Sequence, residues 1–185
     1  MKLIVFPLKH ENPFPVKAEK GVPVSIDSKS SILLTGIGIE GVKTLGSVLS
    51  EYPEFNCIIE FGSAANVTES TMGQLYECTT FLGLDGTILG TSGKMTDLSA
   101  AGVTGGDSVF TGEDYDWTDR HDMPIIFTME TLKFRNVAHE FRKQFVSIRL
   151  VTDDGSGDIR KQIVESLEKS RKKIRELFEK IKECS

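Results

Sequence analysis

Carboxylates follow two apolar segments that lie far apart in the chain. Glu130 comes directly after the β-like run 123–129, and Asp153 and Asp154 come one residue past the run 145–151. Carboxylic acids are among the groups that act as general acids and bases in enzymes. In an α/β sheet, ligands bind beyond the carboxyl ends of the strands. The pattern predicts a site there, although Asp and Glu also favour helix N-termini, so that Glu130 could instead serve the helix that follows it.

A glycine pattern offers a second hypothesis. The sequence Gly36-Ile37-Gly38-Ile39-Glu40-Gly41 separates an expected strand from an expected helix, and Glu60 closes the next strand. A GxGxxG turn followed about 20 residues later by an acid is typical of dinucleotide sites. Here the pattern follows the second strand rather than the first. A tight strand-to-helix turn beside some other ligand is therefore the competing interpretation.

Segments of strand and helix composition alternate along the chain, which predicts an α/β fold with a largely parallel sheet. We expect strands at 2–8, 31–35, 56–61, 124–129 and 145–152, and helices at 39–50, 130–141 and 158–183. The stretch 12–29 is predicted to be loop or hairpin, and 73–106 to be strand and irregular loop. The last helix is long and amphipathic, and we expect it to pack on the sheet with a solvated outer face.

Composition narrows the class of protein. The chain has 185 residues, 39% of them hydrophobic, and a net charge of −5 with a pI near 5.3. Such a charge argues against nucleic-acid and anionic-membrane partners, and no segment approaches the length of a membrane span. The three cysteines (Cys57, Cys78 and Cys184) form neither a disulfide framework nor a metal spacing. The spacing of the three histidines suggests no metal site. From the composition, charge and cysteines we expect a cytoplasmic protein that binds a small molecule.

Five short motifs carry a resemblance to a known family through their joint order. They are Gly36-Ile37-Gly38, Gly62-Ser63-Ala64, Gly105-Gly106-Asp107-Ser108-Val109-Phe110, Met129-Glu130 and Arg149-Leu150-Val151-Thr152-Asp153. In this order the chain resembles the nucleoside phosphorylase and nucleosidase superfamily, most of all the methylthioadenosine/S-adenosylhomocysteine nucleosidases, as a shortened and divergent member. The resemblance implies a single domain over residues 1–185, folded as a three-layer sandwich with a mixed, largely parallel central sheet. It also implies a homodimer, a nucleoside substrate, and neither cofactor nor metal.

The resemblance further implies a role for each of seven residues. Asp153 would protonate the purine leaving group, and Glu11 would handle the water nucleophile. The implied substrate contacts are Ser63 and Ala64 beside the ligand, Phe110 stacked on the base, Met129 beneath the sugar and Glu130 on the ribose hydroxyls. These roles suit the cleavage of an N-glycosidic bond, because negative charge develops on the base and positive charge on the sugar.

The chain departs from the family at several points. Thr128 stands where the family has the first acid of Glu-Met-Glu, and Ala65 stands where it has a glycine. The link 155–157 is short, and the region 84–101 lacks an expected helix. These departures keep open a nucleoside-binding protein with weak or no turnover. A phosphorylase or an NAD-binding enzyme is a further alternative.

Overall fold

The computed structural model describes residues 1–68, 70–112 and 115–183. Its elements are, in order, β1 (Lys2–Phe6), η1 (Lys9–Glu11), β2 (Val24–Ser25), β3 (Ser30–Leu34), α1 (Gly38–Glu51), β4 (Cys57–Asn66), β5 (Leu75–Leu82), β6 (Ile88–Thr91), β7 (Ser99–Gly105), η2 (Thr118–Arg120), β8 (Ile125–Thr128), α2 (Thr131–Glu140), β9 (Gln144–Asp153) and α3 (Ile159–Glu183).

The strands form one mixed sheet that is open on one side and closed on the other. On the open side β1 lies between β3 and β4, and both pairings are parallel. On the other side β4 pairs with β9, β9 with β5, β5 with β7, β7 with β8, and β8 returns to β4. The α/β class and the mixed sheet are as predicted. The ring of five strands was not predicted, because the pairing of β8 with β4 joins segments that are distant in the sequence.

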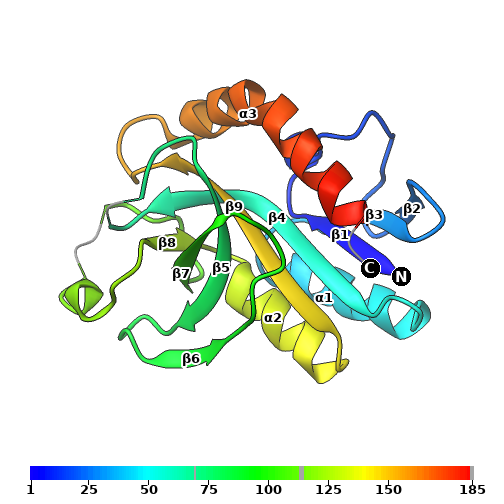
Figure 1. The fold of residues 1–185 in the computed structure, drawn as a ribbon, viewed down its shortest axis with the longest axis horizontal. Coiled ribbons are helices and arrows are strands. Elements are labelled where there is room, and N and C mark those ends of the chain that lie inside the picture. Colours follow the sequence, from blue (N-terminus) through cyan, green and yellow to red (C-terminus); the bar gives the residue numbers. More distant parts are fainter. Residues whose placement is uncertain (69, 113–114, 184–185) are drawn as a thin grey trace.

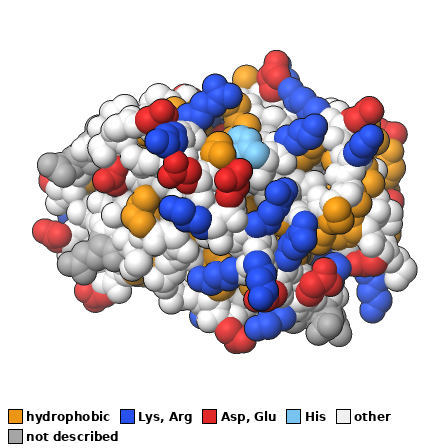
Figure 2. Space-filling model, turned by 90° about the horizontal axis from the view of Figure 1, so that it is seen from above, with side chains coloured by type: hydrophobic (Ala, Val, Ile, Leu, Met, Phe, Trp, Pro, Cys, Tyr) orange, Lys and Arg blue, Asp and Glu red, His pale blue; other side chains and the backbone are white. Residues whose placement is uncertain are grey.

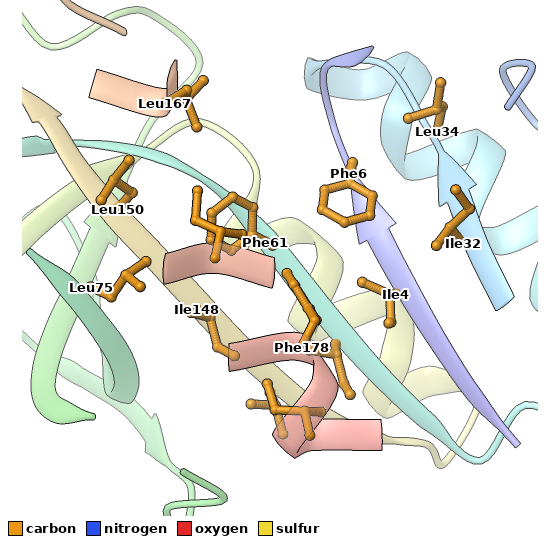
Figure 3. Packing of buried hydrophobic residues seen from close by; sticks show 14 of the residues in the cluster. Ile4, Phe6, Ile32, Leu34, Phe61, Leu75, Ile148, Leu150, Leu167 and Phe178 are labelled. Atoms are coloured by element: carbon orange, nitrogen blue, oxygen red, sulfur yellow. The ribbon is translucent and has the colours of Figure 1, made fainter. Parts of the chain in front are cut away.

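Helices cover both faces of the sheet, which gives three layers (Figure 1). The helices α1 and α2 pack on one face of β1, β3 and β4 through a buried cluster that includes Leu45, Leu49 and Phe134. The helix α3 packs on the opposite face. Its residues Leu167 and Phe178 enter the largest core cluster of the molecule (Figure 3).

The apolar stripe of α3 behaves as predicted from its periodicity. Leu167, Ile174, Phe178 and Ile181 are buried. The Phe178 ring lies 5.8 Å from the Phe6 ring and 5.6 Å from the Phe61 ring, measured between centroids. The outer face of the molecule on this side carries mixed charges rich in Lys and Arg (Figure 2). Within the part of the chain that the structure describes, no helix combines the length and apolarity of a membrane span.

Two regions contain more strand than their sequences suggest. The strand β4 continues to Asn66, five residues beyond the expected end, through small residues that pair with β9 on one side and β8 on the other. The Gly-, Thr- and Ser-rich stretch after β5 forms β6 and β7. Both segments have low intrinsic strand propensity, so it is the ladder with neighbouring strands that holds them extended.

Truncation of Phe178 to alanine tests the packing of α3. We expect Phe178→Ala to lower the free energy of unfolding by about 3–5 kcal/mol, because it removes a buried ring and leaves a cavity. Urea denaturation followed by circular dichroism measures the change. Lys172→Ala, on the exposed face of the same helix, is the control and should shift the value by no more than about 0.5 kcal/mol. Equal losses in the two variants would contradict the packing described.

Candidate active site

A cavity of about 210 Å³ lies where β8 and β9 end and β4 continues past Gly62. All seven residues predicted to form a site line it, and they come from five separate segments of the chain. The full lining is Pro7, Leu8, Glu11, Ile37, Ser63, Ala64, Ala65, Val109, Phe110, Phe127, Thr128, Met129, Glu130, Asp153, Ile159 and Ile163. The structure therefore brings the predicted residues together.

Glu11 is the most strongly perturbed acid in the cavity. Its side chain is buried, Oε1 accepts hydrogen bonds from the Ser63 amide (2.9 Å) and hydroxyl (3.1 Å), and Oε2 accepts one from the Leu8 amide (2.8 Å). Burial raises the pKa of Glu11 to about 7, although these hydrogen bonds and the charge of Arg149 oppose the shift. A carboxyl with a pKa near neutrality can take up a proton and release it again at physiological pH.

Asp153 is the last residue of β9 and is also buried. The Thr152 hydroxyl donates to Oδ2 (2.9 Å) and the Gly155 amide donates to Oδ1 (3.2 Å). Burial raises the pKa of Asp153, because the two hydrogen bonds to the charged form only partly offset the loss of solvation. Its neighbour Asp154 is exposed and does not line the cavity.

Glu130 occupies the N-cap position of α2, yet its side chain makes no capping hydrogen bond there. The carboxylate instead accepts a backbone hydrogen bond from Gly38, at the first turn of α1. Burial raises the pKa of Glu130, and the charge of Arg149 opposes that shift. The side chain of Glu130 therefore belongs to the cavity rather than to the helix that it begins.

Aromatic and small residues form one part of the wall. The ring of Phe110 packs on Phe127 at 5.4 Å and stacks with Tyr115 at 6.3 Å, measured between centroids. Ala65 and Met129 complete this apolar cluster. A flat ring beside small side chains suits the face of a planar base.

Sequence reasoning missed Arg149 as a part of the site. This residue is 1% exposed and does not line the cavity, but it lies directly behind it. Its guanidinium forms an ion pair with Glu60 and donates to Thr131 Oγ1 (2.6 Å) and to the Ser63 carbonyl (3.3 Å). The signal in the sequence was an arginine within the mainly apolar run 145–151, because a charged side chain in a buried strand must have a buried partner.

The GxGxxG pattern does not act as a dinucleotide fingerprint in this fold. Gly36 and Gly38 have positive φ values of 85° and 61°, so they form the tight turn that leads into α1. Glu60, the acid expected to meet a ribose, is fully buried and paired with Arg149. The first turn of α1 is directed at the protein's own Glu130. The competing interpretation, a strand-to-helix turn beside another ligand, accounts for this region.

Two of the departures noted in the sequence, Thr128 and Ala65, lie at the cavity wall. Thr128 lines it, and its hydroxyl accepts a hydrogen bond from the Thr131 amide (3.3 Å). Ile37 and Val109, about half exposed, leave apolar surface on the cavity wall. In the described part of the chain, no group of three or more His, Cys, Asp or Glu side chains is placed to hold a metal ion.

Solved structures share this fold. An MTAN from Chlamydia trachomatis bound to adenine aligns with a TM-score of 0.76 and 16% identity, over 97% of this chain and 96% of that chain. The S-adenosylhomocysteine nucleosidase of Streptococcus pyogenes, in complex with 5-methylthiotubericidin, aligns with a TM-score of 0.72 and 17% identity over 99% and 96%. A variant of the Helicobacter pylori MTAN, with 5′-methylthioadenosine in its active site, aligns with a TM-score of 0.75 and 14% identity over 97% and 98%.

These likenesses show that the chain shares the fold of these solved structures. The neighbours are 5′-methylthioadenosine/S-adenosylhomocysteine nucleosidases (MTAN), as the order of motifs in the sequence suggested. No protein-family model matches the sequence, and no curated protein matches it. At 13–17% identity the likeness is one of fold.

The raised pKa of Glu11 predicts a particular pH dependence of stability. Below the ordinary pKa of 4.5 the acid is protonated in both the folded and the unfolded chain, and above about 7 it is ionised in both. The folded protein should therefore lose stability as pH rises from 4.5 to 7, by about 3 kcal/mol from this group. Urea denaturation of wild type and Glu11→Gln across this range measures it. The difference between them should change with pH, and a constant difference would contradict the shift.

Gly62 must lack a side chain for the cavity wall to form. A Cβ there would overlap Arg149 Nη1 and lie 3.1 Å from Glu11 Oε1, and neither group is free to move. We expect Gly62→Ala to lower the melting temperature, at a cost of about 1–3 kcal/mol in unfolding free energy. Gly46→Ala is the matched control, because a Cβ at this position of α1 meets nothing within 4 Å. That variant should gain up to about 1 kcal/mol. A harmless Gly62→Ala would contradict the close approach.

Proposed function

We propose that the protein is a nucleosidase that hydrolyses the N-glycosidic bond of a purine nucleoside such as 5′-methylthioadenosine. The observation that carries the proposal is the convergence of Glu11, Glu130 and Asp153 on one cavity, each with its pKa raised by burial. The shared fold with nucleosidases supports it, since some of those structures hold adenine or 5′-methylthioadenosine.

The three acids have separate tasks in this reaction. Asp153 transfers a proton to N7 of the purine as the bond between C1′ and N9 breaks, so that the bonding electrons leave with a neutral base. Glu130 accepts hydrogen bonds from the ribose hydroxyls and stabilises the positive charge that develops on the sugar. Glu11 accepts a proton from the water that adds to C1′. The proton lost by Asp153 and the proton gained by Glu11 balance over one turnover.

The walls favour an apolar substituent at the 5′ position of the sugar. Beside Glu11 the cavity is lined by Pro7, Leu8, Ile37 and Ile163, all of which are apolar. A methylthio group would gain about 25 cal/mol for each Å² of its surface removed from water there. A charged 5′ phosphate has no cation to meet, because the described lining contains neither lysine nor arginine.

The same lining favours hydrolysis over phosphorolysis. Arg149 does lie against Gly62, but its guanidinium is held by Glu60, Thr131 and the Ser63 carbonyl and is not open to a phosphate ion. The alternative of a nucleoside-binding protein without turnover rests on the departures from the family, among them Thr128, which replaces an acid of the family motif. Self-association into a dimer and a cytoplasmic location stay predictions.

Adenine release tests the proposal directly. We expect wild type to release adenine from 5′-methylthioadenosine, followed by the change in ultraviolet absorbance, with 5-methylthioribose as the second product in phosphate-free buffer. Asp153→Asn should lower kcat by about 10²–10⁴-fold, because the amide cannot supply the proton.

Asp154→Asn is the matched control for that substitution. It changes the adjacent acid, which is exposed and outside the cavity, and should leave kcat within about twofold. Undiminished release by Asp153→Asn would refute the assigned role. Thermal stabilisation by adenine without any product from wild type would instead establish the binding-only alternative.

A further inference from the structure

Glu60 is a fully buried acid that is paired with Arg149. It lies in the middle of β4, is 0% exposed and does not line the cavity. One carboxylate oxygen pairs with Arg149 Nη2, and the other accepts a hydrogen bond from the Ser147 hydroxyl (2.9 Å). Burying an ion pair of this kind seldom adds net stability, because two charges must be removed from water. This arrangement calls for a role other than stability.

Arg149 connects that acid to the site. Its Nε donates to the Ser147 hydroxyl (3.3 Å), which is itself fixed by Glu60. Its Nη2 also donates to Thr131 Oγ1 (2.6 Å), one residue after Glu130, and its Nη1 donates to the Ser63 carbonyl (3.3 Å). The guanidinium is thus tied to β4, to β9 and to the start of α2.

The same guanidinium faces two acids of the cavity. Arg149 Nη1 and Glu11 Oε1 lie against the same point above Gly62, and its charge lowers the pKa of both Glu11 and Glu130 against the larger effect of burial. One buried cation therefore faces three buried carboxyls.

Other ionisable groups lie near this cluster. Cys78 of β5 is buried close enough to Arg149 to interact with its charge. The charge of Lys133, on α2, lowers the pKa of Glu130. Behind Glu11, a smaller cavity of about 90 Å³ is lined by His10, Glu168 and Arg171 among others.

We propose that Glu60 is a positioning residue that holds Arg149 behind the cavity and offsets its charge, so that Glu11 stays able to accept a proton from the attacking water. This inference rests on the proposed function for its meaning. Without Glu60, the full charge of Arg149 would act on Glu11 and favour its ionised form, so that Glu11 would be a weaker acceptor for the proton of the attacking water. The negative charge of Glu60, and not only its hydrogen bonds to Arg149 and Ser147, is then required at this position.

Substitution by glutamine separates charge from shape. Glu60→Gln keeps the volume and one accepting oxygen, and should lower the titration midpoint of Glu11 by about one pH unit. The midpoint is read from the side-chain carboxyl carbon by NMR with ¹³C-labelled glutamate, and the Glu11 signal is assigned by its loss in Glu11→Gln. Glu77→Gln is the matched control, because Glu77 is another buried strand glutamate, bonded to the Met95 and Thr96 amides and absent from the cavity.

The two variants should differ in this readout even if both melt at a lower temperature. The Glu11 midpoint should stay within about 0.2 units of wild type in Glu77→Gln, since that acid does not touch the cluster. An unmoved midpoint in Glu60→Gln, or equal shifts in both variants, would overturn the proposal. If Glu60→Gln does not fold, Glu60→Asp withdraws the charge by one methylene group and should give a smaller downward shift, with no shift again overturning it.

Kinetics supply the second readout. We expect Glu60→Gln to lower kcat several-fold with little change in KM, because the ligand contacts are untouched. The NMR titration does not depend on turnover. A wild type that releases no adenine would therefore refute the proposed function, and a normal Glu11 titration in Glu60→Gln would refute the positioning role.

Discussion

A guanidinium buried beneath the cavity is the constraint on which the site depends. A buried charge without partners is costly, so the Arg149 guanidinium needs hydrogen-bond acceptors around it. Groups on β4, β9 and α2 supply these acceptors. Meeting that requirement fixes the relative positions of the three segments that carry Ser63, Glu130 and Asp153. Gly62 belongs to the same constraint, since any larger residue would displace the guanidinium.

The pKa values of the acids in the cavity are set by burial more than by ion pairs and hydrogen bonds. For Glu11, Glu130 and Asp153 alike, loss of solvation is the largest cause of the raised pKa. Hydrogen bonds from Ser63, Leu8 and Thr152 moderate the shifts without cancelling them. The result is a set of acids that hold protons to higher pH than ordinary carboxyls do, whereas the neighbouring exposed Asp154 has a lowered pKa because Ser156 donates to its carboxylate. One sequence position thus separates an acid suited to proton transfer from an ordinary surface acid.

The sheet explains why five separated segments meet. The strand β4 runs on past Gly62 and pairs with both β8 and β9, so the ends of the latter two strands are brought to its small residues. The turn at Gly36 and Gly38 then aims the first turn of α1 at Glu130. The helix α3 closes the arrangement from the opposite face, where Ile159 and Ile163 of its first turns line the cavity.

Local patterns in the sequence determined the α/β class, the three long helices and most strand positions, because periodicity and breakers are properties of residues close together in the chain. The resemblance carried by the order of the motifs implied the seven predicted residues that line the cavity. Local patterns could not reveal the ring closed by β8 and β4 or the strands β6 and β7. They also could not reveal that Glu60, which one hypothesis placed on a ribose hydroxyl, forms a buried ion pair with Arg149. Those features depend on contacts between residues far apart in the chain. Only the tertiary structure decides which acids share a cavity, which are buried behind it and which face water, and this burial sets their protonation.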